Sequence, residues 1–327
     1  MPLITVEQLQ KTFRITKRKT GFWGALTSLV NREHITKTAL DGISFHVDEG
    51  ELVGYIGPNG AGKSTTVKIL SGILVPDQGQ VELFGKTPWK SRLDVVSKIG
   101  VVFGQRTQLW WDLPVVESFQ LLKDIYSIPD SAYNKSLDEL VAVLEISRLL
   151  DVPVRQLSLG QRMRCDIAAA LLHNPKILFL DEPTIGLDAV SKLAVRDFVR
   201  HLNKTRDLTV LLTTHDMDDI ETLCSRVIIL NEGKIFSDGT LGDLRKLMQP
   251  ERYLIIDLID PSCTVHDHAA KITRREGPRV WLSFNPEEVS TPELISRVTS
   301  QYAVSDLFVE NPSIEEIIAR LYREANL

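Results

Sequence analysis

GPNGAGKS, at residues 57–64, gives the strongest indication of the fold of this chain. It fits the phosphate-binding pattern G-x-x-x-x-G-K-[ST] at each fixed position. The apolar segment ELVGYIG at 51–57 leads into it and predicts a buried strand, and a helix is expected to begin at about Lys63. Buried strands that alternate with helices continue along the chain, so the sequence predicts an α/β fold with a mostly parallel sheet.

Each residue type in this loop has a chemical reason. The glycines Gly57, Gly60 and Gly62 let the backbone approach phosphate groups closely. Backbone N–H groups and the N-terminus of the next helix attract the anion. Lys63 supplies a cation for the β- and γ-phosphates, and the Ser64 hydroxyl can bind Mg²⁺. The alternative, a glycine-rich turn without a ligand, is disfavoured because the full pattern stands between a predicted strand and a predicted helix. The predicted nucleotide contacts are Gly57, Asn59, Gly60, Ala61, Gly62, Lys63, Ser64 and Thr65.

Two carboxylates follow another apolar strand, in ILFLDEP at residues 177–183. The carboxyl ends of neighbouring parallel strands meet at one edge of a sheet, so Asp181 and Glu182 are expected beside the phosphate loop. Asp181 suits Mg²⁺ binding, directly or through water, and Glu182 suits polarising the water that attacks a phosphate. Two surface acids at a strand end are the alternative, which the pairing with residues 57–64 disfavours.

The pentapeptide LSLGQ at 157–161, followed by FLDEPTIGLD at 179–188, completes a recognisable series. In this order the motifs resemble those of the ATP-binding cassette (ABC) ATPases, over residues 3 to about 247. The likeness is strongest to the cassettes of ABC-2-type exporters. It implies an ABC-type P-loop NTPase fold with a mostly parallel sheet core, an antiparallel β-subdomain and a helical subdomain at about 106–165.

The resemblance also implies roles for further residues. Gln105 matches the Q-loop and is expected at Mg²⁺ and the attacking water. His215 in TTHD matches the switch histidine that contacts the γ-phosphate. Phe13 matches the aromatic residue that stacks on adenine, although the family more often has tyrosine there. The implied catalytic residues are Glu182, His215 and Gln105, and the implied Mg²⁺ ligands are Ser64, Gln105 and Asp181.

Two segments point to a second protein chain. LSLGQ at 157–161 matches the family's signature segment, and IGLD at 185–188 matches its D-loop. Each ATP in this family lies between the phosphate loop of one cassette and the signature segment of another. Ser158 also suits the N-cap of the helix that follows it, where anions bind well. The residues expected to reach the partner's ATP are Ser158, Gly160, Gln161 and Asp188. A homodimer with two working sites, or a heterodimer with another cassette, is compatible with this chain.

The composition separates the chain into two domains and limits its partners. Residues 1–250 form the predicted nucleotide-binding domain, with an insertion at 14–38, and residues 251–327 form a small α+β domain. The insertion is basic and then amphipathic, so it fits a hairpin on the β-subdomain, a membrane surface or a permease contact. The formal net charge of −5 argues against nucleic acid as a partner.

Two clusters of possible metal ligands have simpler interpretations. Cys263, His266 and His268 in CTVHDH match no familiar zinc spacing. Asp216, Asp218 and Asp219 follow His215 at the expected start of a helix, where acidic residues are favoured by the helix dipole. The three cysteines are far apart and fit reduced thiols better than a disulfide framework.

The motifs predict an ATPase, and the resemblance implies that it powers export through a separate membrane permease, at the cytoplasmic face of the membrane. The substrate class expected from the resemblance is xenobiotic or lipid-like. Alternatives are the ATPase of an import system and a soluble ABC ATPase that acts on ribosomes or nucleic acid. Trp110 and Trp111 adjoin the Q-loop, so they are expected either to dock the permease or to pack inside the helical subdomain.

Overall fold

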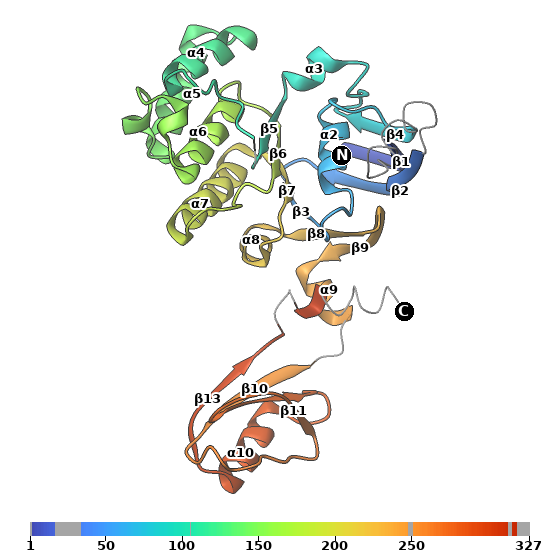
Figure 1. Ribbon diagram of the computed structural model, residues 1–327, viewed down its shortest axis with the longest axis vertical. Helices are drawn as coiled ribbons and strands as arrows, with labels where there is room; N and C mark the ends of the chain where they lie inside the picture. Colours follow the sequence, from blue (N-terminus) through green and yellow to red (C-terminus); the bar gives the residue numbers. More distant parts are fainter. Residues whose placement is uncertain (1, 17–33, 105, 248–250, 313–315, 319–327) are drawn as a thin grey trace, which may run out of the picture. The chain divides into compact units, whose positions relative to one another are not determined.

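The computed structural model describes the chain except for residues 1, 17–33, 105, 248–250, 313–315 and 319–327. Two compact units result, residues 1–238 and residues 239–327 (Figure 1). Within the described residues, no helix is both long enough and apolar enough to cross a membrane.

A six-stranded sheet forms the centre of the first unit, in the order β5-β6-β7-β3-β8-β9. Strands β5, β6, β7, β3 and β8 pair in parallel, which confirms the predicted parallel core. β3 and β7 are buried along their whole length. The carboxyl ends of β3, β6 and β7 lie at one edge, which brings the loops after them together. The strands span Leu52–Ile56 (β3), Ile99–Phe103 (β5), Ile177–Asp181 (β6), Thr209–Thr213 (β7), Arg226–Asn231 (β8) and Lys234–Thr240 (β9).

A three-stranded antiparallel sheet, β2-β1-β4, packs its apolar side chains into the same core. Apolar and polar residues alternate over 3–13 and 39–48, which predicts a strand in each range. The observed strands, β1 (Pro2–Thr16) and β2 (His34–Asp48), are longer. Both ends of the predicted insertion 14–38 therefore belong to strands, and its middle, residues 17–33, lies outside the described residues. β4 (Gln78–Leu83) was not predicted, because four of its six side chains are exposed.

Helices flank the central sheet, and α4, α5 and α6 form a helical group that contacts the sheet through α6 and β5 (Figure 1). Leucines at helical spacing predict helical structure over 115–149. The structure interrupts it, since Ser127 and Glu145 adopt left-handed backbone angles of φ 52° and 53°. The helices are α2 (Lys63–Leu70), α3 (Arg92–Val96), α4 (Val115–Ile125), α5 (Asp130–Val143), α6 (Leu159–Leu171), α7 (Ala189–Arg206) and α8 (Met217–Leu223).

The second unit is an α+β fold, as predicted. Its antiparallel sheet has the order β11-β12-β10-β13, and α10 contributes Leu294 and Val298 to the apolar core that the sheet forms with it. β11 was not predicted, because six of its seven side chains are exposed. The elements are α9 (Leu241–Leu247), β10 (Arg252–Leu258), β11 (Ala270–Glu276), β12 (Arg279–Phe284), α10 (Thr291–Gln301) and β13 (Val304–Glu310).

Candidate nucleotide-hydrolysis site

The phosphate loop lies between β3 and α2, where the sequence predicts it. Gly62 has φ 111°, and a Cβ there would lie 2.5 Å from the Ala39 carbonyl oxygen. A Cβ on Gly57 would lie 2.6 Å from the Leu230 carbonyl oxygen. Both positions therefore require glycine, and the loop is held tightly between β2 and β8.

Lys63 folds back over this loop. Its Nζ donates to the carbonyl oxygens of Gly57, at 2.6 Å, and Pro58, at 3.3 Å. Burial lowers the pKa of Lys63, while the carboxylates of Glu182 and Asp181 act in the opposite direction. The ammonium group thus stands where a bound phosphate can replace its carbonyl partners.

Asp181 joins three elements at the sheet edge. Its Oδ1 accepts hydrogen bonds from the Ser64 hydroxyl, at 3.2 Å, and from the Thr213 hydroxyl, at 2.6 Å. A hydroxyl and a carboxylate this close form an oxygen donor set of the kind that Mg²⁺ prefers. Gln105, the third predicted ligand, lies outside the described residues. Thr213 was not predicted, although the paired threonines before His215 offered a signal.

Glu182 lies beside His215. The Glu182 backbone N–H donates to the Thr213 carbonyl at 2.9 Å, and the Glu182 Oε1 lies 3.7 Å from Nδ1 of His215. Gly104 packs against the other side, since a Cβ there would lie 2.0 Å from the Glu182 carbonyl oxygen. Glu182 itself has φ 55°, a left-handed conformation. The candidate base and the candidate switch residue are therefore in reach of the same small volume.

Two adjoining hollows contain these groups. One, of about 550 Å³, is lined by loop residues together with Phe13, Arg14 and Lys37. The other, of about 950 Å³, includes Ser64, Asp181, Glu182 and His215. Lys37 and Phe13 are cross-strand neighbours on β2 and β1, and the Lys37 Nζ lies 3.9 Å from the site of a Cβ on Gly60. Sequence reasoning missed Lys37 and Arg14, which belong to no spaced motif.

The signature segment forms a capping box at the start of α6. The Ser158 hydroxyl accepts from the Gln161 N–H at 3.2 Å, and the Gln161 side chain accepts from the Ser158 N–H at 2.9 Å. Asp188 caps α7 through Ser191, and these hydrogen bonds lower the Asp188 pKa. Among the described residues that line the two hollows, Ser158, Gly160, Gln161 and Asp188 do not occur.

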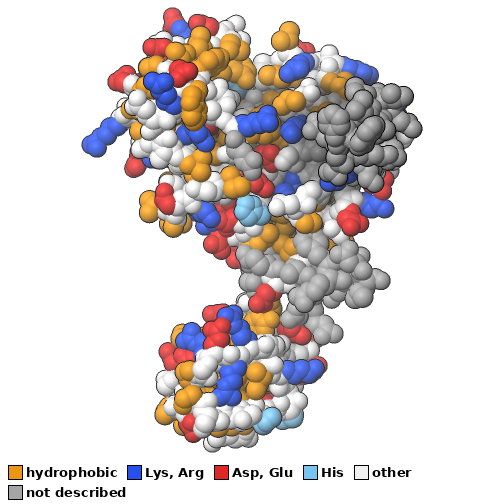
Figure 2. Space-filling view, in the orientation of Figure 1, with side chains coloured by type: hydrophobic (Ala, Val, Ile, Leu, Met, Phe, Trp, Pro, Cys, Tyr) orange, Lys and Arg blue, Asp and Glu red, His pale blue; other side chains and the backbone are white. Residues whose placement is uncertain are grey.

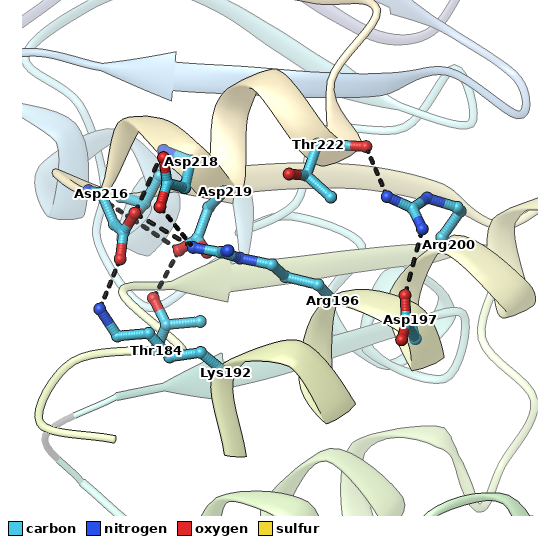
Figure 3. A network of polar contacts seen from close by, with 10 residues as sticks. Thr184, Lys192, Arg196, Asp197, Arg200, Asp216, Asp218, Asp219 and Thr222 are labelled. Atoms are coloured by element: carbon cyan, nitrogen blue, oxygen red, sulfur yellow. Dashed lines mark hydrogen bonds and ion pairs between the residues drawn. The ribbon is translucent and has the colours of Figure 1, made fainter. Parts of the chain in front are cut away.

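Neither the cluster Cys263, His266 and His268 nor the cluster Asp216, Asp218 and Asp219 forms a group that could hold a metal ion, within the described ranges. Asp216 is the N-cap of α8 and accepts from the Asp218 N–H at 3.2 Å, so its helix role was predicted correctly. Asp219 differs from the prediction, since it is fully buried and paired with Arg196 at 2.5 Å (Figure 3). No spacing in the sequence identified Arg196.

The segment after β5 is anchored to α6. The Asp166 Oδ1 accepts from the Thr107 hydroxyl, at 2.8 Å, and from the Gln108 N–H, at 3.0 Å. Burial raises the pKa of Asp166 to about 6, although these hydrogen bonds act to lower it. Trp110 and Trp111, farther along the segment, are 39% and 50% exposed. Both rings are therefore partly exposed, and the Arg162 guanidinium lies over the Trp111 ring, 5.6 Å from its centroid.

Comparison with known proteins gives a consistent result. A protein family described as ABC transporter matches residues 40–185. The chain is 35% identical to the methionine import ATP-binding protein MetN of Geobacillus kaustophilus, over 84% of this chain and 85% of that protein. It is 34% identical to the linearmycin resistance ATP-binding protein LnrL of Bacillus subtilis, over 66% of this chain and 68% of that protein.

Solved structures agree with the fold. An ATP-binding subunit of an ABC transporter superposes with a TM-score of 0.63 and 26% identity, covering 75% of this chain and 92% of that one. A dimeric cassette in a post-hydrolysis state with ADP and Pi gives a TM-score of 0.61 and 28% identity, covering 73% of this chain and 98% of that one. The chain therefore belongs to the ATP-binding subunits of ABC transporters, which bind and hydrolyse ATP.

Proposed function

We propose that this subunit powers export through a separate membrane permease, at the cytoplasmic face of the membrane. The observation that carries the ATPase part is the meeting of Lys63, Asp181 and Glu182 at one sheet edge. Similarity to the linearmycin resistance protein and to the bacitracin transport protein BcrA of Bacillus licheniformis supports export. The proposed substrate class is xenobiotic or lipid-like.

The hydrolysis mechanism follows from the groups at the site. Lys63 and the N–H groups of the phosphate loop neutralise and hold the β- and γ-phosphates. Glu182 takes a proton from the attacking water, and His215 holds the γ-phosphate and that water in position. Mg²⁺, held by Ser64, Asp181 and Gln105, would supply charge neutralisation between the phosphates. Phe13 would stack on the adenine ring.

A complete site needs a second cassette, in a homodimer or a heterodimer. Ser158, Gly160, Gln161 and Asp188 contribute to neither hollow of their own chain, within the residues described. The backbone N–H groups in the first turn of α6 point out of its N-terminal end. Such an end attracts anions. In the proposed dimer, this end faces the γ-phosphate held by the partner.

Glu182→Gln tests the ATPase mechanism. The variant keeps the shape of the side chain and removes the base, so it should abolish steady-state hydrolysis and accumulate an ATP-bound dimer. Size-exclusion chromatography with ATP and a phosphate-release assay measure the two effects. Turnover near the wild-type rate would disprove the role of Glu182.

Trp110 and Trp111 are proposed to dock the permease. Exposed apolar side chains also occur on the neighbouring helices, where Leu121, Ile125 and Val143 are 38%, 63% and 41% exposed, and Figure 2 shows such side chains over this helical group. Aromatic anchors of this kind often dominate binding energy. Trp110→Ala and Trp111→Ala should reduce co-purification of a permease and spare basal ATPase activity. Normal assembly with both variants would refute the docking role.

Import is the second candidate, because MetN of Geobacillus kaustophilus aligns over 84% of the chain. Purification from native membranes should recover a multi-spanning permease, and recovery of ribosomes instead would overturn a transport role. The recovered complex, placed in vesicles with ATP on the cassette side, then decides the direction. Substrate that accumulates on the far side supports export, and substrate that leaves the far side supports import.

A further inference from the structure

The first turn of α7 contacts both segments that are proposed to face a partner cassette. A Cβ on Gly160 would lie 2.6 Å from the Ser191 hydroxyl, so the signature segment packs directly on Ser191. Asp188 accepts from the Ser191 N–H, at 2.9 Å, and from its hydroxyl, at 3.0 Å. The backbone N–H of Lys192, the next residue, donates to the Asp188 carbonyl at 3.0 Å. This turn is thus a single ordered unit.

The same helix holds the loop that carries the candidate switch residue. The Lys192 Nζ lies 2.5 Å from Oδ2 of Asp216, the residue directly after His215 (Figure 3). Arg196, one turn farther along α7, donates to Oδ1 of Asp216 at 3.1 Å. Both carboxylate oxygens of Asp216 are therefore fixed by cations from α7, and the Asp216 side chain is only 17% exposed.

A buried layer beneath this contact fixes the two catalytic loops. Asp219 is fully buried and accepts from Arg196, at 2.5 Å, and from the hydroxyls of Thr184, at 2.5 Å, and Thr214, at 3.1 Å. Thr184 follows Glu182 by two residues, and Thr214 directly precedes His215. Removing one partner of a buried ion pair strongly destabilises a protein, so variants of Arg196 would test folding and not mechanism.

We propose that Lys192 is a positioning residue for His215. Lys192 holds Asp216 from the first turn of α7, the turn that also contacts the segments proposed to face the partner. The position of His215 therefore depends on whether these segments of the same chain are ordered. The inference rests on the proposed function, since it takes His215 as the γ-phosphate contact. Lys192 is 32% exposed and can be changed without opening the buried layer.

Lys192→Gln in the full chain tests the proposal. The kcat for ATP hydrolysis should fall about tenfold, a loss within the usual range of coupling between sites, while KM for ATP changes less than twofold. Lys192→Arg should restore most of the rate. Lys204, an exposed residue in the last turn of the same helix, supplies the matched control, and Lys204→Gln should leave kcat unchanged.

Two further measurements separate positioning from simple stabilisation. In a Glu182→Gln background, Lys192→Gln should not change the ATP concentration needed for dimer formation, since Lys192 acts after assembly. In a double-mutant cycle, Lys192→Gln should add little to the loss of kcat caused by Asp216→Asn.

The proposal is overturned if kcat is unchanged in Lys192→Gln, if the two losses add in full, or if Lys192→Arg gives no rescue. The Glu182→Gln variant distinguishes failure of the positioning role from failure of the proposed function. An inactive Glu182→Gln with a fully active Lys192→Gln removes only the positioning role, whereas an active Glu182→Gln removes the catalytic mechanism itself.

Discussion

Replacing Asp166 with asparagine should stabilise this protein at neutral pH. Asp166 is 4% exposed on α6, and burial raises its pKa from 3.8 to about 6. A shift of about 2 units at ~1.4 kcal/mol per unit corresponds to about 3 kcal/mol. The hydrogen bonds from Thr107 and Gln108 both end at Oδ1, which asparagine also has. Asparagine thus removes the buried charge and keeps both acceptor contacts.

The sign of the pH dependence follows from the direction of the shift. Because the folded-state pKa lies above the unfolded value, the folded protein binds the proton more tightly. The wild type therefore loses stability as the pH rises from about 4 to about 6, and no further above that. Asp166→Asn has no such proton, so its advantage should be near zero at pH 4 and about 3 kcal/mol at pH 7.

Thermal unfolding from pH 4 to pH 8 measures this difference. The first unit has more than 200 residues, for which 1 kcal/mol moves Tm by about 2–4 °C. Asp112→Asn is the control, because Asp112 lies in the same segment with a 75% exposed side chain, and it should show no growing difference. A lower Tm for Asp166→Asn at pH 7, or a difference that does not vary with pH, would refute the reasoning.

Three more predictions concern the nucleotide site. Lys63→Ala should weaken ATP binding at least tenfold by calorimetry, because it removes the cation proposed to hold the phosphates, and unchanged affinity would contradict that role. Lys37→Gln should weaken ATP and ADP binding several-fold, because Lys37 lines the hollow at the phosphate loop. Lys234 is an exposed lysine paired with Asp41, and Lys234→Gln should not weaken binding. Equal affinities for these two variants would exclude Lys37 from the site. Gly104→Ala should lower ATPase activity and Tm together, since its Cβ would overlap the Glu182 carbonyl oxygen at 2.0 Å; an active, stable variant would show that the loop can yield.

The sequence was sufficient to predict the buried strands and the functional loops at their carboxyl ends. Apolar runs such as ILFLD mark strands covered on both faces, and the phosphate loop fixes which edge holds the site. β4 and β11 were missed because their side chains are mostly exposed, so their strand pairing leaves no apolar run.

The contacts that support the site were harder to predict. Arg196 and Asp219 are separated by 23 positions, and only the packing of α7 against α8 makes them a buried pair. Lys37 likewise reaches the phosphate loop through the pairing of β1 with β2. Such partners depend on tertiary geometry, which residue spacing does not encode. By contrast, the Ser158 cap was predictable, because a capping box lies within four consecutive residues.

The left-handed backbone of Glu182 has a consequence for engineering this protein. A non-glycine residue at φ 55° carries a conformational cost on the order of 1 kcal/mol, which glycine would not carry. Part of the folding stability is therefore given up at the residue that we propose as the base for the attacking water. Directed evolution for heat resistance alone would favour the loss of this side chain, so turnover has to be selected in the same round.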